Sequence, residues 1–433
     1  MYVKAWQFYN LVVRLSIKSL KATGPVLEGK VKIYWSKASL FYLFMIAFIG
    51  SSLRAVYFIK LPFLYGNLIH AHSHTAFQGW VYTITLLLIS QLYLNKKQIA
   101  GSHYPLQFKL TILIIIGVLT SFSLQGYGLY SIIFSTLFGL MNYWFILSFF
   151  RDSKNFADNI KNSISLRFIK TGLTLGLLSN LLPLSVGIAS AKGLKGTETY
   201  NSLIYTFLHF QYNGWFLFVI IGLFFKMLEQ DKIPFVNKFA SRFHWLFTIA
   251  VLPAIALSLL GTSFRSYALA PAYFAAVLQI IGLVYFFLAL KPVLKNWLCS
   301  KNIWFKLFLS ASLSSFFIKV ILQSLSVLPQ LEQYAFNNKN VVLAYLHLSL
   351  IGVLSFMLIA ILINIKWLSI NRFTRIGLSS FLAGFVLTEL ILALGGLGVF
   401  YDHKLLFYGS VAMLIGILFL LISPQQLTNN NQL

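Results

Sequence analysis

The sequence predicts an all-α polytopic membrane protein, and three observations support that fold class. Of the 433 residues, 58% are hydrophobic and only 10% are charged, whereas soluble domains carry about a quarter charged residues. Apolar runs of about 20 residues recur along the chain, each long enough to cross a hydrocarbon core of roughly 30 Å. Lysine and arginine also alternate in abundance between successive loops, as expected for a multi-pass protein.

About twelve transmembrane helices are expected, and they fill residues 39–423. Before them lies a basic arm, residues 1–38, which is either an interfacial helix or a plain basic tail, and a polar tail, 424–433, follows them. The predicted helices are 39–59, 68–94, 106–125, 129–150, 168–190, 201–225, 243–262, 268–290, 303–325, 341–365, 373–396 and 403–423.

The net charge of +25 is explained by topology and does not indicate a nucleic-acid partner. If the N-terminus is cytoplasmic, the inner segments hold 26 of the 34 Lys and Arg residues, and the outer loops hold 6. Positive residues favour the cytoplasmic side, so both termini are predicted to be cytoplasmic, in the inner membrane of a bacterium. Membrane lipid is therefore the expected surface partner.

Histidines recur at one depth in the second, sixth and tenth predicted helices. His74, His209 and His347 each precede a glycine by five positions, and two of those glycines are followed by tryptophan. The three histidines are 135 and 138 residues apart, which is four helices each time. A fixed period of this kind indicates a repeated architecture. We therefore predict three four-helix arcs around a pseudo-threefold axis.

Polar side chains at this depth are costly and usually mark a functional site. On the second helix, His70 and His74 share one face and His72 points to the other, so the three cannot converge on one ion. The most economical arrangement places one of them opposite His347 across a cofactor. His74 is the first choice because it occupies the repeated position, and His72 is the second.

Three charged residues also lie in the outer part of predicted helices. These are Arg54, Lys319 and Glu389, and the two cations suit an anionic group such as a haem propionate. Snorkelling of the two cations to the headgroups is the alternative explanation. The single cysteine, Cys299, supplies no thiolate cluster, so any metal site must depend on histidine.

Together, twelve helices, cytoplasmic termini and outer histidines on the second, sixth and tenth helices resemble the haem–copper oxidase subunit I superfamily, including nitric-oxide reductases and NnrS-type proteins. The resemblance implies a low-spin haem of b type held by His74 (or His72) and His347, and a copper or other non-haem metal at His209. It also implies a cytochrome or quinol donor and partner membrane subunits. Two axial imidazoles are compatible with haem iron.

The sequence also departs from that family. Tyr345 stands where the family has the first histidine of an HxH pair, and Asn213 stands where it has a tyrosine. His244 lies at the cytoplasmic start of the seventh predicted helix, where a His–His pair is expected on the opposite side. Glu389 is the one acidic residue well inside a predicted helix. A complete binuclear centre and proton pumping are therefore not expected.

Three functions are compatible with these features. The first is a haem protein in electron transfer, nitric oxide or oxygen chemistry, or sensing; as an enzyme it would be an oxidoreductase of the oxidase or nitric-oxide reductase type. The second is a transporter or metal-handling protein with a histidine metal site. The third is a structural partner that retains remnants of an ancestral site.

Overall fold

The computed structural model describes residues 29–291 and 294–423. The described chain is helical, and it divides into two compact units. The first comprises the chain up to Ser153, residues 362–388 and the chain from Asp402 onward, and the second comprises Lys154–Ile361 and Glu389–Tyr401. The predicted arm over residues 1–28 and the tail 424–433 lie outside the described residues.

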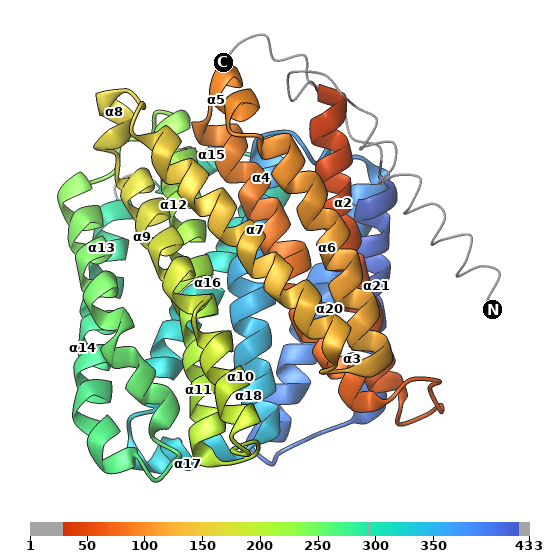
Figure 1. The fold of residues 1–433 in the computed structure, drawn as a ribbon. Coiled ribbons are helices and arrows are strands. Elements are labelled where there is room, and N and C mark those ends of the chain that lie inside the picture. Colours follow the sequence, from red (N-terminus) through yellow and green to blue (C-terminus); the bar gives the residue numbers. More distant parts are fainter. Residues whose placement is uncertain (1–28, 292–293, 424–433) are drawn as a thin grey trace. The chain divides into compact units, whose positions relative to one another are not determined.

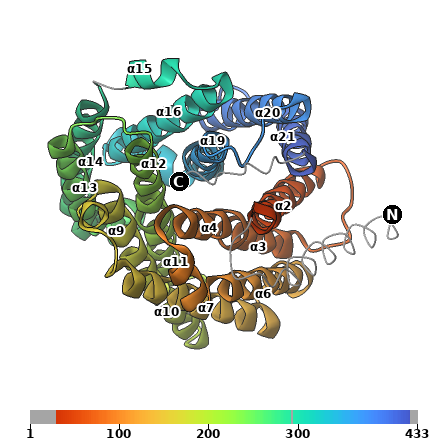
Figure 2. The ribbon, with the colours of Figure 1, turned by 90° about the horizontal axis from the view of Figure 1, so that it is seen from above.

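The first unit begins with α2 (Gly29–Ala55), which starts before the predicted residue 39. A continuous helical stretch follows, made of α3 (Tyr65–His74), η1 (Thr75–Val81) and α4 (Tyr82–Tyr93). The remaining helices of this unit are α5 (Lys96–Gly101), α6 (Tyr104–Gln125), α7 (Leu129–Ser153), most of α20 (Arg372–Gly396) and α21 (His403–Ile422). Although they are far apart in sequence, α2 and α21 lie side by side (Figure 2).

The second unit contains the other two histidine helices. Its elements are α8 (Asp158–Lys161), α9 (Ile164–Ser179), α10 (Leu182–Ala191), α11 (Glu198–His209), η2 (Phe210–Phe216), α12 (Leu217–Gln230), α13 (Asn237–Val251), η3 (Pro253–Leu259), α14 (Arg265–Leu290), α15 (Leu294–Cys299), α16 (Ile303–Leu325), α17 (Pro329–Asn337), α18 (Lys339–His347), η4 (Leu348–Ser355) and α19 (Phe356–Asn364). Within it, α9 packs on α12, and α13 packs on α14 (Figure 1).

Ten helices of the described chain are long and apolar enough to cross a membrane, and α13 with η3 gives an eleventh if that bent pair is one span. Their outward faces carry exposed leucine, isoleucine and phenylalanine, such as Leu140, Leu184 and Phe274. Soluble monomers rarely expose contiguous apolar surface on this scale. The chain is therefore an all-α, multi-pass membrane protein.

Two predicted spans differ from a simple apolar helix. The stretch Tyr65–Tyr93 is not among the ten apolar spans, and its first turns hold the polar side chains of His70, His72, Ser73 and His74. The seventh predicted helix begins earlier, at Asn237, and bends by 49° at Pro253. Proline lacks a backbone N–H and clashes with the preceding turn, so the α-helix ends there and a 3₁₀ segment follows it.

Two pairs of glycines bring α20 and α21 into backbone contact within the first unit. A Cβ atom built on Gly384 would lie 2.5 Å from the carbonyl oxygen of Gly409, and one on Gly377 would lie 2.7 Å from that of Gly416. Both glycines of each helix are seven residues apart, so they lie along one face. Small residues allow such close approach, which is typical of helix association in membranes.

Candidate functional site

Each of the three repeated histidines is followed at once by a π-helical segment. His74 precedes η1, His209 precedes η2 and His347 precedes η4, and in every case the repeated glycine is the fifth residue of the segment. π-Helical turns are rare, and they occur frequently at functional sites. Because the same distortion recurs at the same position, the three helices share a local structure as well as a sequence pattern.

The repeated glycines in the first two segments are used for helix packing. A Cβ on Gly79 would lie 3.0 Å from the side chain of Tyr42 on α2, and one on Gly214 would lie 3.4 Å from Leu175 on α9. The contacts at both positions therefore indicate close packing of helices at a small residue.

His72 lies on α3 and faces α2. Its Nδ1 is 3.0 Å from the carbonyl oxygen of Ile46. A carbonyl can only accept, so Nδ1 carries the proton and Nε2 is the unprotonated nitrogen. Gly50 makes room for the ring, because a Cβ there would lie 3.0 Å from Cε1 of His72. An imidazole that donates Nδ1–H to a backbone carbonyl is in the tautomer that is usual for metal-ligating histidines.

His74 points to the opposite side, as the helical spacing predicted. Its ring stacks on Phe122 of α6 with centroids 4.1 Å apart, and its Nε2 is 3.1 Å from the hydroxyl of Tyr127. The ring of His70 also lies against Tyr127, at 4.6 Å. His70 and His74 therefore form one aromatic cluster with α6 and the segment that follows it.

His347 lies beside a carboxylate in the second unit. Its Nδ1 is 3.6 Å from Oε1 of Glu389, and both side chains are largely buried. Metal-ligating histidines commonly direct this nitrogen to a carboxylate, which orients the ring and increases the basicity of the other nitrogen. Glu389, one of the three charged residues predicted to lie in the outer part of the helices, is thus placed beside the ring of His347.

His209 is buried, with 1% of its surface exposed, and contacts are present at both ring nitrogens. Nε2 is 2.9 Å from the carbonyl oxygen of Val251 and therefore donates to it. Val251 is the last residue of α13, and a 3₁₀ segment follows it. In an α-helix the N–H of Ile255 would donate to the carbonyl of Val251, but here it donates to the carbonyl of Leu252. The bend at Pro253 thus provides the acceptor that fixes the tautomer of His209.

The second ring nitrogen of His209 begins a chain of hydrogen bonds to Lys319. With Nε2 protonated, Nδ1 accepts from the side-chain amide of Asn213 at 3.2 Å. The oxygen of the same amide accepts from Nζ of Lys319 at 2.5 Å. Asn213 is four residues after His209, so the two side chains lie on one helical face.

Lys319 is buried on α16, with 2% of its surface exposed. Besides Asn213, its Nζ donates to Oε1 of Gln323 at 3.1 Å, and the hydroxyl of Tyr345 donates to the same oxygen at 2.7 Å. The ammonium also lies 5.7 Å from the centroid of the Tyr345 ring. Amide oxygens and an aromatic face thus surround the cation, and the ion pairs found among the described residues do not include Lys319.

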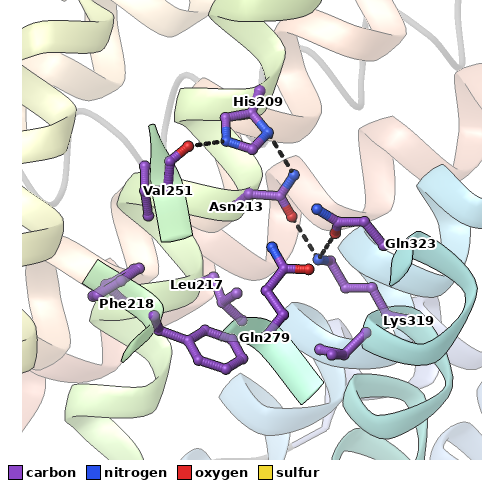
Figure 3. A pocket seen from close by; sticks show the side chains of 10 residues that line it. His209, Asn213, Leu217, Phe218, Val251, Gln279, Lys319 and Gln323 are labelled. Carbon is purple, nitrogen blue, oxygen red and sulfur yellow. Dashed lines mark hydrogen bonds between the residues drawn. The ribbon is translucent and has the colours of Figure 1, made fainter. Parts of the chain in front are cut away.

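These side chains line a small pocket inside the second unit (Figure 3). Its polar wall contains His209, Asn213, Gln279, Lys319 and Gln323, and its apolar wall includes Leu217 and Phe218. Gln279 reaches in from α14, and within the part of the chain described here its buried Oε1 makes no hydrogen bond. The pocket therefore contains one ammonium and three amide oxygens, and the ammonium donates hydrogen bonds to two of those oxygens.

The histidines of the two units differ in the surroundings of their ring nitrogens. Nδ1 of His72 donates to a backbone carbonyl, whereas Nδ1 of His347 lies 3.6 Å from a carboxylate oxygen. At His209 both nitrogens are engaged and the nearest charged group is an ammonium, which repels a metal cation. Residues 29–291 and 294–423 contain no cluster of three or more His, Cys, Asp or Glu side chains that could hold a metal ion.

The predicted site residues thus separate into distinct environments. Arg54 lies in the last turn of α2, and His72 and His74 lie in the same unit. Lys319, which was expected near a propionate or at the headgroups, is instead bonded within the pocket that contains His209. His347 belongs to the same unit as that pocket.

Sequence reasoning missed the polar residues that line the pocket or lie beside Lys319. Gln279 and Gln323 were not considered, and Asn213 and Tyr345 were noted only as departures from a family pattern. A usable signal was present in α16, where the polar residues Ser312, Ser315, Lys319 and Gln323 recur at spacings of three and four and therefore share one face. All four are buried.

Neither a protein-family model nor a curated protein sequence matches this chain.

Proposed function

We propose that this chain is a haem-binding membrane protein of the haem–copper oxidase type, acting in electron transfer or in the chemistry or sensing of nitric oxide or oxygen. The observation that carries the proposal is the threefold recurrence of a histidine followed by a π-helical segment. The proposal includes twelve spans in three arcs. These are the ten apolar helices, the bent pair at Pro253 and the stretch Tyr65–Tyr93.

In this proposal His347 and a histidine of α3 are the axial ligands of a b-type haem, which supplies a reversible one-electron centre. The carboxylate of Glu389, 3.6 Å from Nδ1 of His347, is proposed to orient the imidazole when the haem is bound. His74 occupies the repeated position, whereas the bond from His72 to Ile46 supports His72 as the α3 ligand. Arg54 remains a candidate for pairing with a propionate.

The proposal places the protein in the cytoplasmic membrane of a bacterium, with both termini cytoplasmic. The distribution of Lys and Arg supports this orientation. A cytochrome or quinol would act as electron donor, and partner membrane subunits are part of the proposal. As an enzyme the protein would be an oxidoreductase, without proton pumping.

Absorption spectra test the haem site directly. The purified full-length protein, expressed with ample haem, should show a sharp α-band after reduction with dithionite. That band should disappear in His347→Ala and in one of His72→Ala and His74→Ala, which identifies the α3 ligand. His103→Ala is the matched control, since His103 is exposed and precedes α6. A colourless wild-type protein would refute the proposal.

A transporter is the second candidate function, and the bend at Pro253 favours it. Broken helices with freed carbonyls near a buried polar site are typical of secondary transporters. Here the carbonyl of Val251 lies at such a break and contacts His209. Uptake of a substrate into proteoliposomes by a haem-free protein, abolished in Lys319→Met, would support this candidate over the haem protein.

A further inference from the structure

The pocket at His209 combines features that are unusual for a metal site. A metal ligand needs a free lone pair, yet Nε2 of His209 donates to Val251 and Nδ1 accepts from Asn213. Cation sites in proteins also need oxygen or nitrogen atoms around the ion. Here such atoms are present, but they surround the ammonium of Lys319.

We propose that this pocket is a monovalent-cation site of the ammonium type that Lys319 fills from within the chain. His209 is then a positioning residue and not a metal ligand. The proposal does not depend on the presence of haem, because every contact that carries it lies among α11, η2, α13, α16 and α18 of the second unit.

The proton positions in this network follow from the cation. An ammonium can only donate, so the oxygen of Asn213, and not its NH₂ group, must face Lys319. The NH₂ group then faces Nδ1 of His209, which must be unprotonated and accept. Nε2 must therefore carry the proton, and it meets a carbonyl that can accept it. One positive charge at Lys319 fixes the whole chain of donors and acceptors.

The surroundings of the ammonium also favour a cation over an anion. Its bonded partners are the amide oxygens of Asn213 and Gln323, and Oε1 of Gln279 lines the same pocket. The face of the Tyr345 ring adds a cation–π contact at 5.7 Å. An anion would meet these negative ends of dipoles, whereas a monovalent cation is stabilised by them. The pocket has no carboxylate or thiolate, and both nitrogens of its one imidazole are engaged, so it lacks the ligands that copper and zinc prefer.

The first test measures metal in the wild-type full chain. Protein expressed with added copper and zinc is purified and its copper, zinc and non-haem iron are counted per chain, with haem iron determined separately from the pyridine haemochrome spectrum. We expect far less than one non-haem metal atom per chain, and no change in His209→Ala. One bound atom per chain that is lost in His209→Ala would overturn the proposal.

The second test asks whether the emptied pocket takes an external cation. Lys319→Ala removes the ammonium but keeps its acceptors, so methylammonium or ethylammonium should raise its unfolding temperature at constant ionic strength. Lys319→Met is the matched control, because its side chain fills the space with apolar atoms and should not respond. Equal responses of the two variants, or none in Lys319→Ala, would overturn the proposal.

The two tests also separate this proposal from the haem proposal. A protein with a normal α-band and one copper atom lost in His209→Ala would keep the haem and reject the lysine-filled site. A colourless protein without bound metal, whose Lys319→Ala variant responds to methylammonium, would reject the haem and support the lysine-filled site. The metal count uses the wild type and His209→Ala but not Lys319→Ala, so the proposal stays testable if Lys319→Ala is unstable.

Discussion

Replacing Asn213 with leucine should destabilise the protein more than removing the buried cation itself. Asn213 accepts from Lys319 through its oxygen and donates to His209 through its nitrogen, and leucine can do neither. The variant therefore leaves a buried ammonium without one of its two bonded oxygens, and a buried ring nitrogen without its donor.

The expected magnitude follows from the burial of these groups. Removing a hydrogen bond to a buried charged group costs about 1.5–3 kcal/mol, since the ammonium keeps only the oxygen of Gln323. The orphaned acceptor on His209 adds about 1–3 kcal/mol. Lys319→Met removes both the charge and the cost of burying it. Its free energy of unfolding should therefore fall by no more than about 1–3 kcal/mol, because two amide oxygens lose a donor.

The assay is unfolding of the purified protein in mild detergent, followed by tryptophan fluorescence. The predicted order of stability is wild type, then Lys319→Met, then Asn213→Leu. The double variant should be more stable than Asn213→Leu alone, because it no longer buries an unpaired charge. If Asn213→Leu is as stable as Lys319→Met, or the two losses simply add, then the ammonium is not held by Asn213 as described.

Three further predictions concern other contacts. Gly384→Ala should lose about 1–3 kcal/mol of stability in the same unfolding assay, because its Cβ would meet the backbone of α21, whereas Gly139→Ala, with no neighbouring atom within 4 Å, should not. Arg265→Lys should lower the free energy of unfolding by about 1 kcal/mol at low salt and by less at high salt. Only arginine can make the bidentate contact with Glu332, at 2.8 and 2.9 Å, and equal losses at both salt concentrations would contradict this. Glu389→Gln should retain the reduced α-band but raise the midpoint potential of the haem in a redox titration, because a negative charge beside His347 is removed.

The proposed filling of the His209 pocket by Lys319 has a functional consequence. A protein with one haem and with Lys319 in the pocket at His209 could pass electrons or bind a gas at the haem. The pocket itself would contribute only a fixed positive charge. This agrees with the sequence departures at Asn213 and Tyr345, since both residues are used to surround the cation.

Sequence alone placed the helices well, because helix formation across a membrane depends on local hydropathy. Most predicted ends lie within a few residues of those in the structure, including 303–325 and 403–423. The exceptions have local causes. α2 extends back to Gly29, within the residues that were predicted to be a basic arm. The predicted helix 243–262 breaks at Pro253, because proline cannot continue the helix.

The histidine repeat was also determined by the sequence, through one histidine and one glycine at a fixed spacing. The structure added the π-helical segment at each histidine, which no residue type signals reliably. Helical spacing likewise separated His72 from His70 and His74. Their partners, the carbonyl of Ile46 and the hydroxyl of Tyr127, come from other helices and were not predictable.

Only the tertiary structure decided where Lys319 points. The sequence predicted either a haem propionate or the outer headgroups as the partner of Lys319. The ammonium donates instead to Asn213, more than one hundred positions away in the chain. Hydropathy and helical periodicity are properties of neighbouring residues, so they fix which segments are helices and which faces are polar. The pairing of those faces depends on how distant helices pack, and the burial of a charge depends on that pairing.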